Sequence, residues 1–251
     1  MAASIFDSPM FVTSFPTGEA ARLFSDSAAV RAVLLVEGSL AKVQGELEIV
    51  PEDSAFFIHR SGMEVQIDPA GLAADMLTGG FAEAVAKAFA KAMEAPEHSK
   101  FILHDVNPDE IEAVALALRI RQFLSYCDKR IAEIENGQID KAAMTAALSE
   151  ARSSAIGLHM SAGLNVAKPL ADALRLPLCE QPMQPEAVSA AAALICNRLS
   201  EAYPDCTSLG QLHLLSSGLN ETITKDPAHM LSICLPQACL CAASALEIVS
   251  R

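Results

Sequence analysis

The stretch that decides the fold class is the last long apolar segment of the chain, DPAHMLSICLPQACLCAASALEIV, residues 226–249. Asp226 followed by Pro227 is a typical helix start, because aspartate caps the first turn and proline is tolerated at the first helical position. Apolar residues then recur at alternating spacings of four and three: Leu231, Leu235, Ala238, Ala242, Ala245 and Val249. This spacing predicts a helix that packs lengthwise against a neighbour, with a kink at Pro236.

Earlier segments repeat this pattern. The range 153–174 is predicted to be one helix, kinked at Pro169, with a seam made of Ile156, Met160, Gly163, Ala167, Leu170 and Leu174. Pro185 opens a helix to about residue 202, and Ser208 with Gln211 forms a capping box for a helix that ends near Gly218. Long seam-bearing helices of this kind predict an all-α helical bundle.

The rest of the chain also favours helix, because it is rich in alanine and poor in aromatic residues. Helices are expected over 25–47, 52–68, 68–77, 81–93, 107–135 and 138–150, with an irregular start and a polar connection over 94–107. The range 52–68 also suits brief strands. We therefore expect an N-terminal helical region over 1–106 and a long-helix bundle over 107–251.

Composition restricts the function. Of the 251 residues, 18 are basic and 31 acidic, which gives a formal charge of −13 and argues against binding nucleic acid or an anionic membrane. We expect no membrane-spanning helix and no signal peptide. Seven cysteines, an odd number mostly in apolar runs, suit reduced thiols in the cytoplasm. The alanine-rich seams leave much apolar surface, so a homo-oligomer is expected.

Several blocks of sequence resemble a known family. The opening resembles that of the 3-carboxy-cis,cis-muconate cycloisomerases of the fumarase/aspartase superfamily in the segments FDSPMF (6–11), ARLFSD (21–26), VEGSLA (36–41) and IVP (49–51). DEIEAVAL (109–116) is similar to the start of the family's first long bundle helix. GLNVA (163–167) and LRLPL (174–178) resemble a later family segment. The resemblance spans most of the chain and is most specific in the first fifty residues.

The resemblance implies a fold of long helices that assembles as a tetramer, with active sites built from three subunits. It also implies cofactor-free addition to, or elimination from, a carbon–carbon double bond that bears carboxylates. Such chemistry needs cations and hydrogen-bond donors for the carboxylates, and an acid/base group at the reacting carbon. The small domain that follows the bundle in the family is expected to be absent.

The family's three catalytic motifs are only partly present. The His-x-Gly-x-Thr-Ser loop corresponds to LHDVNP (103–108), where His104 is displaced by one place and Asn107 replaces a hydroxyl residue. Nothing matches the Thr-His loop. The Gly-Ser-Ser-x-Met-Pro-x-Lys loop corresponds to 216–227, which keeps Ser216, Ser217 and Lys225. The resemblance thus indicates His104, Ser216 and Ser217 as catalytic residues and Lys225 and Asn107 as binding residues for a small carboxylate, in a degenerate site.

Less specific interpretations stay open. Serines near a helix end are often caps, and a loop lysine or histidine is often only solvated or part of an interface. Cys234, Cys239 and Cys241 suit buried thiols better than a metal site, since only two of them share a helix face. Glu37 interrupts an apolar stripe and is expected to pair with a basic group across an interface. The alternative to an impaired enzyme is a non-catalytic helical oligomer that acts as a scaffold or regulatory partner.

Overall fold

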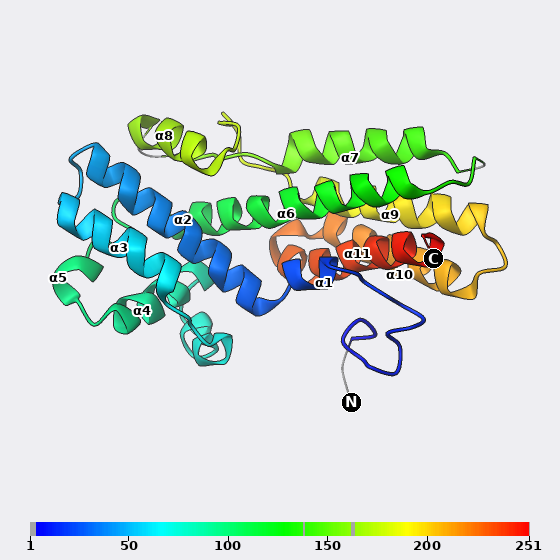
Figure 1. Ribbon diagram of the computed structural model, residues 1–251, viewed down its shortest axis with the longest axis horizontal. Helices are drawn as coiled ribbons and strands as arrows, with labels where there is room; N and C mark the ends of the chain where they lie inside the picture. Colours follow the sequence, from blue (N-terminus) through cyan, green and yellow to red (C-terminus); the bar gives the residue numbers. More distant parts are fainter. Residues whose placement is uncertain (1–3, 138, 162–163, 251) are drawn as a thin grey trace. The chain divides into compact units, whose positions relative to one another are not determined.

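The computed structural model of the chain describes residues 4–137, 139–161 and 164–250 (Figure 1). In these ranges it contains α-helices, two 3₁₀ helices and no strand. The nearest approach to a sheet there is an isolated parallel bridge between Leu158 and Leu178. The prediction of an all-α fold is confirmed, and the ambiguous range after residue 52 is the helix α3, Glu52–Glu64.

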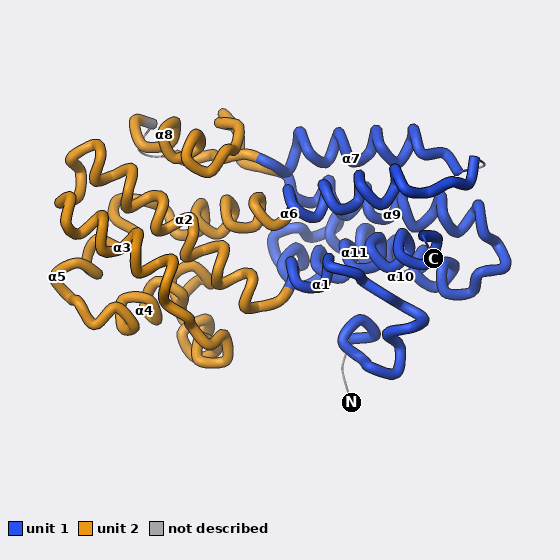
Figure 2. Tube along the Cα trace, in the orientation of Figure 1, with its two compact units in different colours: residues 1–24, 120–156, 184–251 blue, residues 25–119, 157–183 orange. Residues whose placement is uncertain are grey.

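The chain forms two compact units that interleave along the sequence (Figure 2). Unit 1 contains residues 1–24, 120–156 and 184–251, and unit 2 contains residues 25–119 and 157–183. The chain passes from unit 2 to unit 1 within α6, Pro108–Glu133. The sequence-based boundary at 106/107 falls inside unit 2.

Unit 2 is built on α2, Asp26–Glu46, against which α3 packs along its length. Gly45 allows this close approach, because a Cβ atom there would overlap the Cβ of Ala55 on α3. Two further packed elements are α4, Phe81–Met93, and α8, Leu164–Leu174. The short helices of this unit are η1, Pro69–Leu72, η2, Asp75–Leu77, and α5, Pro96–Ser99.

Unit 1 is a helical bundle. Three helices of this bundle each pack on the other two (Figure 1): α9, Glu186–Ala202, α10, Thr207–Lys225, and α11, Pro227–Val249. The central seam residues of α11 are buried as predicted: Leu235, Ala238, Ala242 and Ala245. Two more helices pack on this bundle: α7, Lys141–Ala155, on α9, and α1, Ala20–Leu23, on α11.

Helix α11 is apolar enough to meet a criterion for membrane spans that no segment was expected to meet. By length and composition this helix could cross a membrane, with a mean hydropathy of 1.6 over its most apolar 18 residues. More than half of that window is buried inside the protein, and the helix carries the seam of unit 1. The core helix of a soluble bundle meets the same criteria, so the apolar length of α11 matches its packing role.

The predicted single helix over 153–174 is wrong. Helix α7 ends at Ala155, and α8 begins at Leu164. Between them Leu158 donates to the carbonyl of Pro177 and accepts from the amide of Cys179, both at 2.8 Å. These long-range bonds replace helical ones over this stretch. Gly163 of the predicted seam lies outside the described residues, whereas Pro169 is inside α8 as expected.

Candidate functional site

His104 lies on a tight loop of unit 2 between α5 and α6. The residues on either side of it, Leu103 and Asp105, have φ angles of 53° and 54°, in the left-handed region that non-glycine residues rarely adopt. The His104 ring contacts the Phe101 ring edge-on, with 5.7 Å between ring centroids. The loop therefore presents His104 at a sharply turned and conformationally costly segment.

Asn107 is the N-cap of α6. Its side-chain oxygen accepts a hydrogen bond from the amide of Asp109 at 3.0 Å, and its carbonyl accepts from Glu110 at 3.1 Å. This bond satisfies one of the amides that a helix start leaves unpaired. The side-chain oxygen of Asn107 is thus used to cap α6. Its side-chain nitrogen is the group that could donate to a carboxylate.

Two buried side chains of α2 bind the His104 loop. The Oε1 atom of Glu37 accepts from the amide of Leu103 at 2.8 Å, and the Nε2 atom of Gln44 donates to the carbonyl of His104 at 2.7 Å. Within the described residues this backbone amide is the partner of Glu37, and a basic group across an interface stays a prediction. The Oε2 atom of Glu37 has no hydrogen-bond partner among the described residues. Burial raises the pKa of Glu37 to about 7, and the bond from Leu103 opposes the rise.

A small cavity adjoins this loop within unit 2. It measures about 240 Å³ and is lined by Gln44, Ile49, Asp105, Val106, Met160, Asn165 and Val166. Its polar lining consists of two amides and one carboxylate. Because no cation is among the described residues that line it, these residues offer a polycarboxylate no charge partner.

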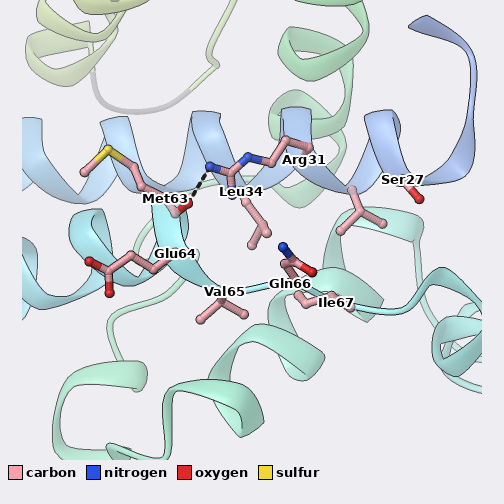
Figure 3. Close-up of a pocket in the computed structure, with 9 residues that line it drawn as sticks. Ser27, Arg31, Leu34, Met63, Glu64, Val65, Gln66 and Ile67 are labelled. Atoms are coloured by element: carbon pink, nitrogen blue, oxygen red, sulfur yellow. Dashed lines mark hydrogen bonds between the residues drawn. The ribbon is translucent and has the colours of Figure 1, made fainter. Parts of the chain in front are cut away.

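A second hollow of unit 2 contains an arginine that is already engaged. Figure 3 shows Arg31 of α2 reaching toward the carbonyl of Met63, at the end of α3. Its guanidinium donates to the carbonyls of Gly62 and Met63 at 2.8 and 2.7 Å. These are carbonyls that a helix end leaves unpaired, so Arg31 caps α3.

Ser216 and Ser217 lie inside a helix, contrary to the predicted loop. Helix α10 continues through Gly218 to Lys225. Ser216 is fully buried in unit 1, where its hydroxyl donates to the carbonyl of His213 at 3.1 Å. Ser217 is half-buried and lies 3.4 Å from Nδ1 of His213. Of the two serines, Ser217 is the one that has exposed surface in this unit.

Lys225 forms an ion pair with Glu221 one turn earlier on α10, at 2.6 Å. Both side chains are largely exposed, and the bond with Lys225 lowers the pKa of Glu221. A surface pair of this kind contributes little stability, so the ammonium can exchange Glu221 for another carboxylate at small cost.

The predicted residues divide between the two units. His104 and Asn107 belong to unit 2, and Ser216, Ser217 and Lys225 belong to unit 1. Sequence reasoning missed Gln44, which has no motif and acts through a contact sixty residues away. It also missed His213, whose spacing of four residues from Ser217 becomes meaningful once both lie on one helix.

The cysteines are free thiols. Cys127, Cys196, Cys234, Cys239 and Cys241 are buried in unit 1, and burial raises the pKa of Cys196 to about 12. Within the described part of the chain, no three histidine, cysteine or acidic residues are grouped to hold a metal ion.

The all-α fold is shared with solved enzymes. Two of them match 96% of this chain at a TM-score of 0.81. These are the beta-carboxy-cis,cis-muconate cycloisomerase of Acinetobacter calcoaceticus, 14% identical and matched over 76% of its length, and the 3-carboxy-cis,cis-muconate lactonizing enzyme of Pseudomonas putida, 18% identical and matched over 75%.

A third similar structure is a fumarate lyase from Mesorhizobium, with a TM-score of 0.77 and 16% identity over 92% of this chain and 73% of the other. No protein-family model and no curated protein sequence matches the chain. At these identities the likeness establishes the fold and leaves the chemistry to be argued from the residues.

Proposed function

We propose that the chain is a 3-carboxy-cis,cis-muconate cycloisomerase-like protein that acts on a small polycarboxylate with impaired activity. The observation that carries this proposal is the match, over 96% of the chain, to two enzymes named for muconate lactonisation. The His104 loop supports it, because an acid/base residue held at a costly backbone turn is typical of functional sites.

The proposed reaction needs no cofactor. One carboxylate oxygen of the diene acid forms a C–O bond to an alkene carbon, the π electrons move to the neighbouring carbon, and that carbon takes a proton. His104 is the proposed proton donor, since histidine titrates near neutral pH. The Asn107 amide beside His104 would hold a substrate carboxylate. Lys225, Ser216 and Ser217, which belong to unit 1, are retained as separate candidates.

Two observations support impairment. The Ser216 hydroxyl is buried and bonded inside unit 1, and no cation is among the described residues that line the cavity beside the His104 loop. Each removes or occupies a group that would stabilise developing negative charge, which is usually the largest contribution to such catalysis.

The same observations favour the second candidate, a non-catalytic helical oligomer that acts as a scaffold or regulatory partner. In both cases we propose a cytoplasmic homo-oligomer, a dimer or a tetramer, that binds neither nucleic acid nor membrane. The formal charge of −13 supports the last two points.

The test is a turnover assay on purified protein of known oligomeric state, in which the loss of diene absorbance of 3-carboxy-cis,cis-muconate is followed. Slow turnover that falls at least about tenfold in His104→Gln and Lys225→Ala supports the enzyme. Lys168→Ala is the matched control, because Lys168 forms the same exposed i,i+4 pair with Asp172 on α8. No turnover by a folded oligomer at high enzyme concentration supports the scaffold.

A further inference from the structure

The His104 loop is held by an unusual pair of contacts. Glu37 and Gln44 are seven residues apart on α2, so their side chains project from one face of the helix two turns apart. One accepts from the amide of Leu103, and the other donates to the carbonyl of His104. The two hydrogen bonds therefore fix the backbone at both ends of the Leu103–His104 pair.

These two contacts have a free-energy cost, which indicates that they serve a purpose other than packing. Glu37 and Gln44 are only 3% and 2% exposed, and burying a carboxyl group with one oxygen unpartnered is unfavourable. The loop is costly too, because Leu103 and Asp105 both adopt left-handed backbone angles. A helix that needed only packing at these positions would be served better by leucine.

We propose that Glu37 and Gln44 are positioning residues that fix the backbone of the loop carrying His104, which gives the imidazole a single orientation. The importance of this orientation for catalysis rests on the proposed function, in which His104 delivers the proton. The positioning of the loop by Glu37 and Gln44 does not depend on that function. The two parts can therefore be tested apart.

The first experiment measures the loop without any substrate. Hydrogen exchange of the Leu103 amide and the His104 ring signal are followed by NMR in the full-length protein, with the signal assigned by its loss in His104→Gln. Gln44→Glu is nearly isosteric and lacks the donor when its carboxyl group is ionised, and Glu37→Ala removes the acceptor. In both variants the Leu103 amide is expected to exchange about tenfold faster or more, and the His104 signal to shift.

Two controls separate the loss of these hydrogen bonds from a general destabilisation of the protein. Glu37→Gln keeps an acceptor oxygen and is expected to stay within about twofold of the wild-type exchange rate. Gln237→Glu removes a similar side-chain donor to a backbone carbonyl on α11 and is expected to leave the loop unchanged. If Glu37→Ala does not fold, Gln44→Glu and Gln44→Ala decide. Wild-type exchange and an unshifted His104 signal in these variants overturn the proposal.

The second experiment applies if the protein turns over the diene. Gln44→Glu is then expected to lower kcat with little change in KM, and the effect should vanish in the His104→Gln background, because a positioning residue acts only through the group that it positions. Equal losses in both backgrounds contradict the positioning role. Absence of turnover in the wild type contradicts the proposed function alone, because the exchange measurements stand without it.

Discussion

At the scale of single residues, the charge of one buried carboxyl group should govern how stability depends on pH. Glu37 has a pKa of about 7 in the folded protein, raised by burial from an ordinary value of 4.5. Between these values the unfolded chain gives up the proton that the folded chain keeps, so the contribution of Glu37 to stability falls as pH rises and then levels off above pH 7. The full loss is roughly 3 kcal/mol.

Glu37→Gln removes this titration. The variant is expected to match the wild type near pH 4.5 and to exceed it by up to roughly 3 kcal/mol at pH 8, less the cost of an unpaired amide. Urea unfolding followed by circular dichroism at several pH values measures the difference. Glu46→Gln, at an exposed position of the same helix, is the control. A Glu37→Gln curve parallel to the wild type at every pH would show that the carboxyl group is not penalised by burial.

A second residue-scale prediction concerns Glu94, which ends α4 with a φ angle of 52°. Glycine adopts this conformation without the steric cost that a Cβ atom brings. Glu94→Gly is therefore expected to raise the free energy of unfolding by about 1 kcal/mol. Glu83→Gly, exposed in the first turn of the same helix, should lower it by about as much. Urea unfolding measures both, and effects of the same sign would contradict the left-handed cap.

At the scale of elements, α10 provides a direct test of where a helix ends. Gly218 lies inside it with nothing within 4 Å of an added Cβ. Gly218→Ala should therefore stabilise the protein by about 0.5–1 kcal/mol. The same substitution at Gly45 should destabilise it, because the new methyl group would overlap Ala55. Thermal unfolding of both variants measures these effects. A destabilising Gly218→Ala would contradict a helix through Gly218 and would favour the loop that the sequence predicts.

The elements also show what the sequence can and cannot predict. The start of α11 was found at Asp226-Pro227, although the Asp226 side chain makes no cap bond within the described part of the chain. Asp68 caps η1 through the amide of Ala70, but the single helix predicted over 68–77 is two short 3₁₀ helices. The end at Gly218 was predicted wrongly, because glycine costs a helix only about 1 kcal/mol and packing can offset that. The break before α8 depends on bonds between Leu158 and residues 177–179, which spacing alone cannot reveal.

The candidate site was predictable to the same extent. His104, Asn107 and Lys225 follow from resemblance to short motifs, whereas the partners of the His104 loop do not. Glu37 was noticed as a charge within an apolar stripe, yet its partner is a backbone amide 66 residues away. Gln44 carries no signal of its own, since a buried glutamine is recognised only by the group that it bonds.

At the scale of the whole molecule, the resemblance implies assembly, and the surface of the unit 1 bundle supports it. Leu214 on α10 is 74% exposed and Ile233 on α11 is 59% exposed, although both helices pack on each other and on α9. Contiguous exposed apolar side chains are typical of surfaces that bind another protein, and Leu214 and Ile233 are the candidates for such a surface on this bundle. A second copy of the chain is the partner that the alanine-rich seams predict.

Association should then strengthen with salt, because two copies that each carry a formal charge of −13 repel one another, and salt screens that repulsion over distances of about 10 Å or more. Leu214→Glu is expected to weaken association at least about tenfold, since it places a charge in an apolar contact. Leu77→Glu, at a position 88% exposed in η2 of unit 2, adds the same charge and should not. Sedimentation at low and high salt measures both. A monomer under all conditions, or equal weakening in the two variants, would contradict assembly through α10, because the added charge alone would then explain the result.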